Sequence, residues 1–308
     1  MKRIYFWVAT FCIICMFASC SEDVTKFEDY DRNWFALEDD PSDPAAHAAY
    51  EFYQEYGIPV FDNNIIGEQE RKDVWGNTYI HQETLTLNYS MGGMATANSS
   101  PSISSFTLCD KAVVPSAIQF IKNNIMPLLP KGIHIQSFLL VESMKSQAFG
   151  DRAFKGLNTI VIANASKLAT MEGKEKTQTI SAIMRAIMGD YILNNKDYKE
   201  KLEQFYNVSR RLSPEKDIYN MYKEWLRQYV TGADPNDWQH PTMQEVGFLG
   251  PDPSNSYYTP SSTWMDFNMY LESYYNHSAE EFEAEYQTYP YIMEKYNIVP
   301  QFGIKEKG

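Results

Sequence analysis

The chain has 308 residues and a formal net charge of −13. Hydrophobic residues make up 44% of it and charged residues 22%, a globular composition that excludes a disordered chain. The acidic balance argues against nucleic acid as a partner, because a negative surface repels phosphate backbones.

The first residues of the chain predict a secretory signal. In "MKRIYFWVATFCIICMFASC", Lys2 and Arg3 precede an apolar run over residues 4–17 that is too short to span a membrane. The small residues directly before Cys20 match the lipobox of bacterial lipoproteins. We therefore predict a lipoprotein signal peptide over residues 1–19 and a lipid on Cys20. The alternative is an ordinary cleaved signal that happens to contain a cysteine.

The residues after Cys20 predict where the protein is held. "SED", directly after the lipidated cysteine, resembles a surface-export signal of lipoproteins in one Gram-negative group. Loss of Lys2 and Arg3 takes the net charge from −13 to −15, so the protein surface repels anionic head groups and the lipid must hold the membrane. We predict a lipid anchor in the outer membrane, with the protein facing the cell exterior.

The mature chain is predicted to consist of an acidic tether over residues 20–42 and a single domain over 43–308. The domain opens with a helix over 43–57, marked by an Asp-Pro pair at its start and by Gly57 at its end. Strands are predicted over 58–67, 83–89, 133–143 and 157–166, a loop over 90–105, and helices over 114–130, 177–195, 197–206, 213–232, 260–276 and 278–299. Strands come first and helices later, which predicts an α+β fold with a small mixed sheet beside a helical half.

Few residues carry a recognisable catalytic pattern. No two histidines are four residues apart, so no helix presents a histidine pair to a metal. Apart from Cys20, the mature chain keeps only Cys109, so no internal disulfide is predicted, and we expect Cys109 to be a small buried side chain. The histidines are His47, His81, His134, His240 and His277.

Six blocks occur along the mature chain in an order that is typical of one protein family. They are "YEFYQEYGIPVFDNNIIGEQ" (50–69), "LPKGIHIQSFLLVES" (129–143), "GLNTIVIANASKLATM" (156–171), "EVGFLGPDPS" (245–254), "SSTWMDFNMYLESYY" (261–275) and "IMEKYNIVPQFGI" (292–304). Together they resemble the substrate import-associated zinc metallohydrolases, Gram-negative lipoproteins also described as zinc-binding metallopeptidases. The resemblance implies a zincin-like scaffold.

In active members of that family, the helix after "TIVIANA" carries a His-Glu-x-x-His motif, which binds zinc and supplies the general base. Here the corresponding helix, "TISAIMRAIMGDYI", contains neither histidine nor glutamate. Ala182, Ala186 and Gly189 follow one another at i, i+4 and i+7 and form a strip of small side chains. Because small residues let a neighbouring element approach closely, we predict that the former site face is packed shut.

The segment "TWMDFNMY" lies where the family places an acidic segment that completes the site. Asp266 and Glu272 are acidic, but acids without histidines are a poor ligand set for zinc. We therefore assign no catalytic residue, no metal ligand and no cofactor. The alternative is an active zinc metallopeptidase with a non-standard ligand set, such as His240 or His277 with Asp266.

These features favour a non-catalytic binding or accessory component of TonB-dependent nutrient uptake, built on a degenerate metallopeptidase-like fold. The resemblance implies a TonB-dependent importer and its partner lipoprotein as partners. Tyr257, Tyr258 and Trp264 are candidate ligand-binding aromatics for a peptide or a glycan, although such side chains also serve in core packing. A purely structural subunit of a surface complex is the remaining alternative.

Overall fold

The computed structural model describes residues 32–88, 102–146 and 149–305. The chain consists of a short N-terminal unit, which ends at Trp34, and a compact unit, which begins at Phe35. The predicted signal peptide, Cys20, most of the predicted tether, and the predicted loop as far as residue 101 lie outside the described residues.

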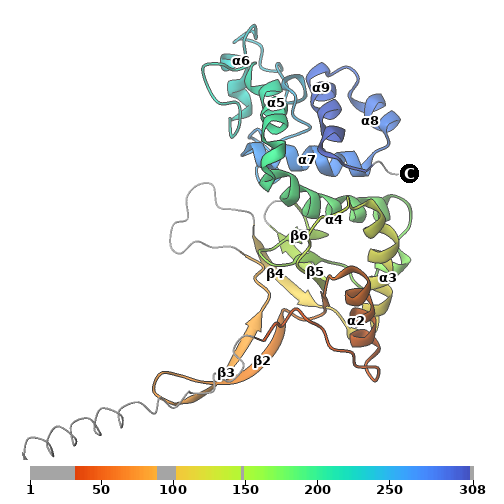
Figure 1. Cartoon of the computed structure of the whole chain (residues 1–308). Helices are drawn as coiled ribbons and strands as arrows, with labels where there is room; N and C mark the ends of the chain where they lie inside the picture. The colour runs from red at the N-terminus through yellow and green to blue at the C-terminus, as the bar shows by residue number, and fades with distance from the viewer. Residues whose placement is uncertain (1–31, 89–101, 147–148, 306–308) are drawn as a thin grey trace, which may run out of the picture. The chain divides into compact units, whose positions relative to one another are not determined.

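The compact unit contains a mixed sheet of five strands (Figure 1). Its order is β1-β5-β7-β6, and β4 also pairs with β5. β1, β5 and β7 are parallel, with Phe138 opposite both Val60 and Ile160, whereas β4 and β6 run antiparallel to their neighbours. The strands are β1 (Val60–Phe61), β4 (Ile103–Leu108), β5 (Phe138–Ser146), β6 (Ala153–Lys155) and β7 (Ile160–Ile162).

This sheet confirms the predicted α+β class and the small mixed sheet. β5 and β7 overlap the predicted strands at 133–143 and 157–166, but β5 begins and ends later and β7 is shorter. The sequence predicts a loop as far as residue 105, which is wrong from Ile103 onward, because β5 pairs with this segment and takes up its backbone hydrogen bonds. β6 is a further strand that the sequence pattern does not predict.

A separate two-stranded hairpin is formed by β2 (Ile65–Lys72) and β3 (Thr78–Thr84). Its strands are antiparallel, with Lys72 opposite Thr78. The predicted strands at 58–67 and 83–89 only overlap its two ends. Most hairpin residues are polar and half or fully exposed, so no apolar alternation marks these strands in the sequence.

The first helix has the boundaries that its capping residues predict. α2 (Pro44–Tyr56) begins after Asp43, whose carboxylate accepts hydrogen bonds from the backbone N–H groups of Ala45 and Ala46. It ends at Gly57, which has the left-handed conformation that favours glycine, with φ of 71°.

Helices dominate the second half of the chain, as predicted. The α-helices after α2 are α3 (Val114–Asn124), α4 (Gly173–Asn194), α5 (Lys199–Arg210), α6 (Leu226–Tyr229), α7 (Thr263–Asn276), α8 (Ala279–Tyr286) and α9 (Pro290–Ile298). Short 3-10 turns connect them: η1 (Lys111–Val113), η2 (Met126–Leu128), η3 (Leu168–Thr170), η4 (Lys196–Tyr198), η5 (Lys223–Trp225), η6 (Gln244–Val246) and η7 (Val299–Phe302). α8 begins with a capping box formed by Ser278 and Glu281.

Two predicted helices are wrong. Residues 278–299 form two helices rather than one, because Pro290 cannot continue α8 and instead begins α9. The segment 213–232 contains only η5 and α6. The backbone before these two elements forms hydrogen bonds with a loop that is distant in the sequence. The N–H of Asn220 donates to Pro260 O at 2.9 Å, and the N–H of Thr259 donates to Met221 O at 2.9 Å.

The largest hydrophobic cluster joins the sheet to the helices. It includes Phe138 and Ile160 from the strands, Ile183 and Ile187 from α4, and Phe267 from α7. α4 contacts β6 and β7 as well as α7. None of the described helices has the length and apolar character needed to cross a membrane.

Candidate functional site

The helix that the resemblance assigns to a metal site is α4, and its middle, from Thr179 to Gly189, is buried. Ala182 and Ala186 are 1% and 4% exposed, and α7 packs along α4 (Figure 1). The approach is very close at Gly189, where a Cβ atom would lie 2.2 Å from Asn268 Oδ1 on α7. The predicted close packing of another element on this strip is therefore confirmed at Gly189.

Arg185 links the same two helices, and the sequence analysis did not identify it. Nε donates to Glu272 Oε2 at 2.6 Å and Nη2 donates to Ala153 O at 3.1 Å. The guanidinium carbon lies 4.0 Å from the ring centre of Phe149. Burial lowers the pKa of Arg185, and the charge of Glu272 opposes that change. One of the two acids that the resemblance brings to the site is thus paired with a cation from α4.

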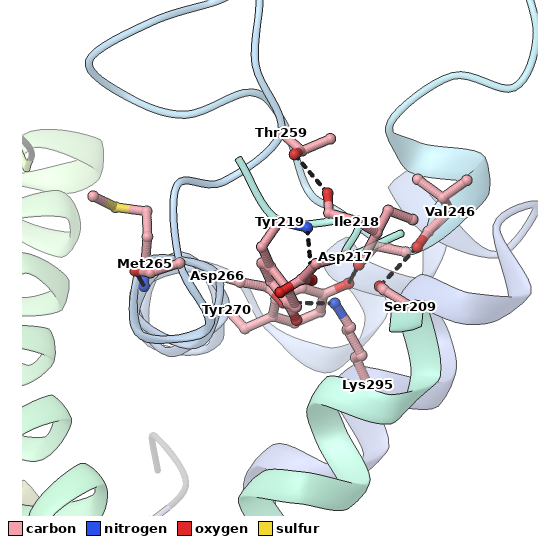
Figure 2. Close-up of polar contacts among 12 residues, drawn as sticks. Ser209, Asp217, Ile218, Tyr219, Val246, Thr259, Met265, Asp266, Tyr270 and Lys295 are labelled. Atoms are coloured by element: carbon pink, nitrogen blue, oxygen red, sulfur yellow. Dashed lines mark hydrogen bonds and ion pairs between the residues drawn. The ribbon is translucent and has the colours of Figure 1, made fainter. Parts of the chain in front are cut away.

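The other acid, Asp266 on α7, belongs to a buried polar cluster (Figure 2). Its Oδ2 accepts hydrogen bonds from Lys295 Nζ and from the hydroxyl of Tyr219, each at 2.7 Å. Lys295 comes from α9, and Tyr219 from the segment before α6. The ammonium also lies 4.6 Å from the ring centre of Phe248 and 4.9 Å from that of Phe205. The cluster thus joins α7, α9 and the segment before α6.

Burial controls the protonation of this cluster. It raises the pKa of Asp266, while Lys295 and then Tyr219 oppose the rise. It lowers the pKa of Lys295 and raises that of Tyr219. The second carboxylate oxygen, Asp266 Oδ1, has no hydrogen-bond partner among the described residues.

The structure does not bring the histidines of the alternative ligand set to Asp266. His240 Nδ1 lies 2.9 Å from Glu245 Oε2, and His277 Nδ1 lies 3.1 Å from Ser273 Oγ. The remaining histidines are His47 on α2, His81 on β3 and His134 before β5. In the part of the chain that the structure describes, no three His, Cys, Asp or Glu side chains gather as a group that could hold a metal ion.

Cys109 is half-buried rather than fully buried. Its thiol donates to Leu140 O at 3.5 Å. Burial, together with nearby acids such as Asp62, raises the pKa of Cys109 to about 11. The thiol is therefore protonated at neutral pH, which makes it a poor nucleophile.

Two of the three predicted aromatics belong to an exposed aromatic patch, which we define as Tyr222, Trp225, Tyr257 and Tyr258. The ring of Tyr222 stacks on Tyr257 with 6.3 Å between ring centres and 23° between planes. Tyr222 also meets Tyr258 and Trp225 edge-on, at 5.6 and 6.4 Å. Tyr257 is 56% exposed and Trp225 is 44% exposed, so the patch presents aromatic surface to solvent.

Lysines border the aromatic patch. Lys223 Nζ lies 5.2 Å from the ring centre of Tyr257, and Lys216 Nζ lies 4.0 Å from that of Trp225. Each ammonium therefore stands next to an exposed aromatic ring. The patch combines flat apolar faces with hydrogen-bond donors.

Backbone pairing fixes the patch. Tyr222 and Tyr258 form an antiparallel bridge, and the N–H of Lys223 donates to Tyr257 O at 2.8 Å. The loop that carries Tyr257 is closed by Asp252, which accepts hydrogen bonds from the backbone N–H groups of Ser254 and Ser261, each at 2.8 Å. Burial tends to raise the pKa of Asp252, but hydrogen bonds from the side chains of Ser254 and Ser261, and then from their backbone N–H groups, outweigh it and lower the pKa.

The sequence did not identify Tyr222 and Trp225 because they lie in a segment predicted as helix. No local pattern connects that segment to the loop around Tyr257. Trp264, the third predicted aromatic, is not brought into the patch: it packs edge-on against Phe149, with 5.3 Å between ring centres. Its half-buried ring joins the Arg185 side of the α4–α7 interface.

A cavity of about 440 Å³ lies between the starts of β5 and β7 and the end of α4. Lys155 Nζ, on its wall, is 3.8 Å from Asp190 Oδ2. His134 also lines it. The walls mix charged, amide and apolar groups, and the hydroxyls of Ser137 and Thr159 on them donate to backbone carbonyl oxygens.

Known proteins give no further information on these features. Compared with models of known protein families, with curated proteins and with solved structures, the chain matches none of them.

Proposed function

We propose that this protein is a lipid-anchored lipoprotein of the outer membrane that serves TonB-dependent nutrient uptake as a non-catalytic binding or accessory component. Its scaffold is proposed to be that of a zinc metallopeptidase that has lost its metal site. The observation that carries this proposal is the packing of α7 on α4, which leaves no space for a side chain at Gly189.

The two acids of α7, Glu272 and Asp266, support the absence of catalysis. A zinc site needs three or four donors that reach a common point, each with a free lone pair. Glu272 accepts from Arg185, and Asp266 accepts from Lys295 and Tyr219. Glu272 is thus paired with Arg185 of α4, whereas Asp266 is paired with Lys295 of α9, so the two acids do not meet at one point and do not fit a zinc ion.

The aromatic patch supports the binding half of the proposal. Exposed Tyr and Trp rings offer flat apolar faces to the faces of sugar rings or to peptide side chains. Lys223 and Lys216 add donors for hydroxyl or carboxylate oxygens. The backbone bond from Lys223 to Tyr257 and the bond that the Asp252 carboxylate accepts from Ser261 already hold the patch in place. Binding of a ligand would therefore lose little conformational entropy.

Metal analysis of the purified mature protein tests the loss of catalysis. After dialysis against a chelator, we expect no zinc by mass spectrometry and an unchanged melting temperature, because among the described residues no three His, Cys, Asp or Glu side chains gather to hold a metal ion. Stoichiometric zinc that resists dialysis, together with a chelator-sensitive peptidase activity, would overturn the proposal in favour of an active metallopeptidase with another ligand set.

Calorimetric titration with soluble oligosaccharides, such as maltoheptaose, and with mixed peptides tests the binding role. Where a ligand is found, Trp225→Ala should weaken its binding about tenfold, the equivalent of roughly 1.4 kcal/mol. Trp238→Ala is the matched control, since Trp238 is 71% exposed and lies outside the patch. Equal loss in both variants would exclude the patch as the binding surface.

The anchor and the partner are tested in cells. Cys20→Ala should move the protein from the membrane fraction to the soluble fraction, because the lipid is its proposed anchor. Chemical cross-linking of intact cells should join the unaltered protein to a TonB-dependent importer. Protease treatment of intact cells should degrade it; a chain that is protected until lysis is periplasmic instead.

A further inference from the structure

The β2–β3 hairpin ends in a group of exposed apolar side chains, which we call the hairpin tip: Val74, Trp75, Tyr79 and Ile80. Their side chains are 90%, 83%, 45% and 57% exposed, respectively. Large apolar side chains that gather at one place on a surface mark an interaction site more often than isolated ones do. The rest of the hairpin is polar or only partly exposed.

The turn that carries Val74 and Trp75 is held by its own hydrogen bonds. Asp73 Oδ1 accepts from the backbone N–H groups of Trp75, at 2.9 Å, and Asn77, at 2.8 Å. Asp73 Oδ2 accepts from the Asn77 side chain at 2.9 Å. The polar groups of the turn are thus satisfied internally, while Val74 and Trp75 point outward. An apolar partner can cover these side chains without leaving those backbone groups unpaired.

The exposed side chains are not confined to one face of the hairpin. Tyr79 and Ile80 are neighbours in β3, so they point to opposite faces. Val74 and Trp75 lie at the apex between them. A flat protein surface would cover one face only, whereas a medium that surrounds the apex would cover all four residues. The membrane interface is such a medium, and Trp and Tyr are enriched there.

The chain also enters the compact unit close to the base of the hairpin. Phe35, the first residue of that unit, packs edge-on against Phe61, with 6.0 Å between ring centres. Leu85, directly after β3, belongs to the same hydrophobic cluster as Phe61, and Ile66 at the start of β2 packs against that cluster. The point at which the chain enters the compact unit, Phe35, therefore lies near the base of the hairpin.

Simple lengths show that the tip can reach the bilayer that holds the lipid. Residues 20–34 are 15 in number and extend to at most about 50 Å. The eight residues of β2 span roughly 26 Å. The hairpin is thus shorter than the longest reach of the segment between Cys20 and Phe35.

We propose that the hairpin tip inserts into the lipid interface of the bilayer in which the protein is anchored. This inference rests on the proposed lipid anchor of Cys20. The tip then acts as a second membrane contact, and it sets the orientation of the compact unit that a single lipid attachment leaves open. Val74 and Trp75 enter the interface, and the exposed Lys72 at the end of β2 lies next to lipid phosphates.

Site-specific fluorescence on the full lipidated chain tests this inference. Val74→Cys is labelled with an environment-sensitive nitrobenzoxadiazole group in a Cys109→Ala background, and the protein is reconstituted into vesicles of phosphatidylethanolamine and phosphatidylglycerol. We expect a blue-shifted emission from the label at position 74. Lipids that carry a doxyl group close to the head group should quench its intensity to roughly half. The matched control is Trp238→Cys, a position outside the hairpin that is 71% exposed against 90% for Val74, which should show neither change.

Two outcomes would overturn the inference, and they differ from a failure of the anchor. Protein that does not float with the vesicles shows that the lipid anchor is absent and removes the premise. Protein that floats but keeps the spectrum of a solvent-exposed label at position 74 shows that the tip stays outside the lipid. A blue shift in isolated outer membranes that is absent in pure lipid vesicles would assign the tip to a protein partner instead.

Discussion

Lys295 Nζ lies 2.7 Å from Asp266 Oδ2, and the two residues are 0% and 1% exposed. The pair joins α9 to α7 inside a ring of aromatic side chains. A buried pair of this kind adds little net stability over an apolar pair, but breaking it leaves a charge without a partner in a dry interior. In the resemblance, Asp266 belongs to the acidic segment of the metal site. Here its partner is a lysine.

Lys295→Met should therefore destabilise the protein by roughly 3–5 kcal/mol, because Asp266 loses the ammonium that balances its charge. Urea unfolding measures the change. Adding Asp266→Leu to this variant should recover much of the loss, since the second change removes the unpaired carboxylate. Lys111→Met is the control, because the pair of Lys111 and Asp43 lies at the surface and should matter far less. Equal effects of both lysine variants would contradict the interpretation.

Gly189→Ala tests the closure of the α4–α7 interface. Alanine favours a helix over glycine by about 1 kcal/mol, but its Cβ would lie 2.2 Å from Asn268 Oδ1. Asn268 is 3% exposed and its amide donates to Trp264 O at 2.9 Å, so it cannot move away freely. We expect a net loss of about 1–3 kcal/mol in urea unfolding.

The rescue variant makes this prediction specific. Gly189→Ala combined with Asn268→Ala should be more stable than the sum of the two single changes predicts, because the second change removes the clashing oxygen. Gly250→Ala is the control for an ordinary glycine, since its Cβ would meet only Met269 Cε at 3.8 Å. A Gly189→Ala protein as stable as the unaltered one would show that α7 can shift away from α4.

Local signals in the sequence predicted elements whose boundaries depend on local chemistry. Asp43 and Gly57 gave the ends of α2, and the helix predicted to begin at residue 278 agrees with the N-cap of α8 at Ser278. Apolar residues at helical spacing were sufficient to predict α4, although its middle is buried all round rather than on one face. The strip of small side chains that ends at Gly189 predicted that another element packs closely on α4. It did not predict that this element is α7.

What the sequence could not predict depends on contacts between distant segments. The segment from Ser213 to Tyr222 has helix-forming residues, but Asn220 and Lys223 bond to the loop of Tyr257 instead. Tertiary pairing outweighs helix propensity there, and it assembles the aromatic patch. The β2–β3 hairpin was missed because neither face of it is fully buried, so no period of two appears in its apolar residues.

Thr259→Val tests how the aromatic patch is held. The Thr259 hydroxyl is buried, donates to Ile218 O at 2.7 Å and accepts from the N–H of Met221 at 2.9 Å. Valine has nearly the same shape but leaves both backbone groups unsatisfied, so we expect a loss of about 1–3 kcal/mol in urea unfolding. The emission of Trp225 should also shift to the red as the segment loosens.

The matched control is Thr107→Val, because that hydroxyl bonds the Ser143 hydroxyl at 2.7 Å at an exposed position. Water can replace this bond, so the control should change stability little. If Thr259→Val were as stable as the control and left the Trp225 emission unchanged, backbone pairing alone would hold the patch.

The turn of the hairpin tip should loosen in acid. Hydrogen bonds lower the pKa of Asp73 from its usual 3.8, that from the Asn77 side chain being the largest cause. Because the folded pKa lies below the unfolded one, the stabilisation is fully present above pH 3.8 and is lost as the pH falls through the folded pKa. Protection factors for the amide hydrogens of Trp75 and Asn77, measured from about pH 5 to about pH 2, should therefore fall at the acidic end.

The amide of Ile65, at the other end of β2, separates this effect from general acid unfolding. It donates to Asn63 Oδ1 at 2.9 Å, and an amide acceptor does not titrate. Its protection should therefore stay constant over the range in which that of Trp75 falls. Asp73→Asn keeps a hydrogen-bond acceptor without the titrating carboxylate, so it should remove the pH dependence at Trp75. If the protection of Trp75 is unchanged down to about pH 2, or falls together with that of Ile65, the carboxylate of Asp73 does not hold the turn that presents Val74 and Trp75.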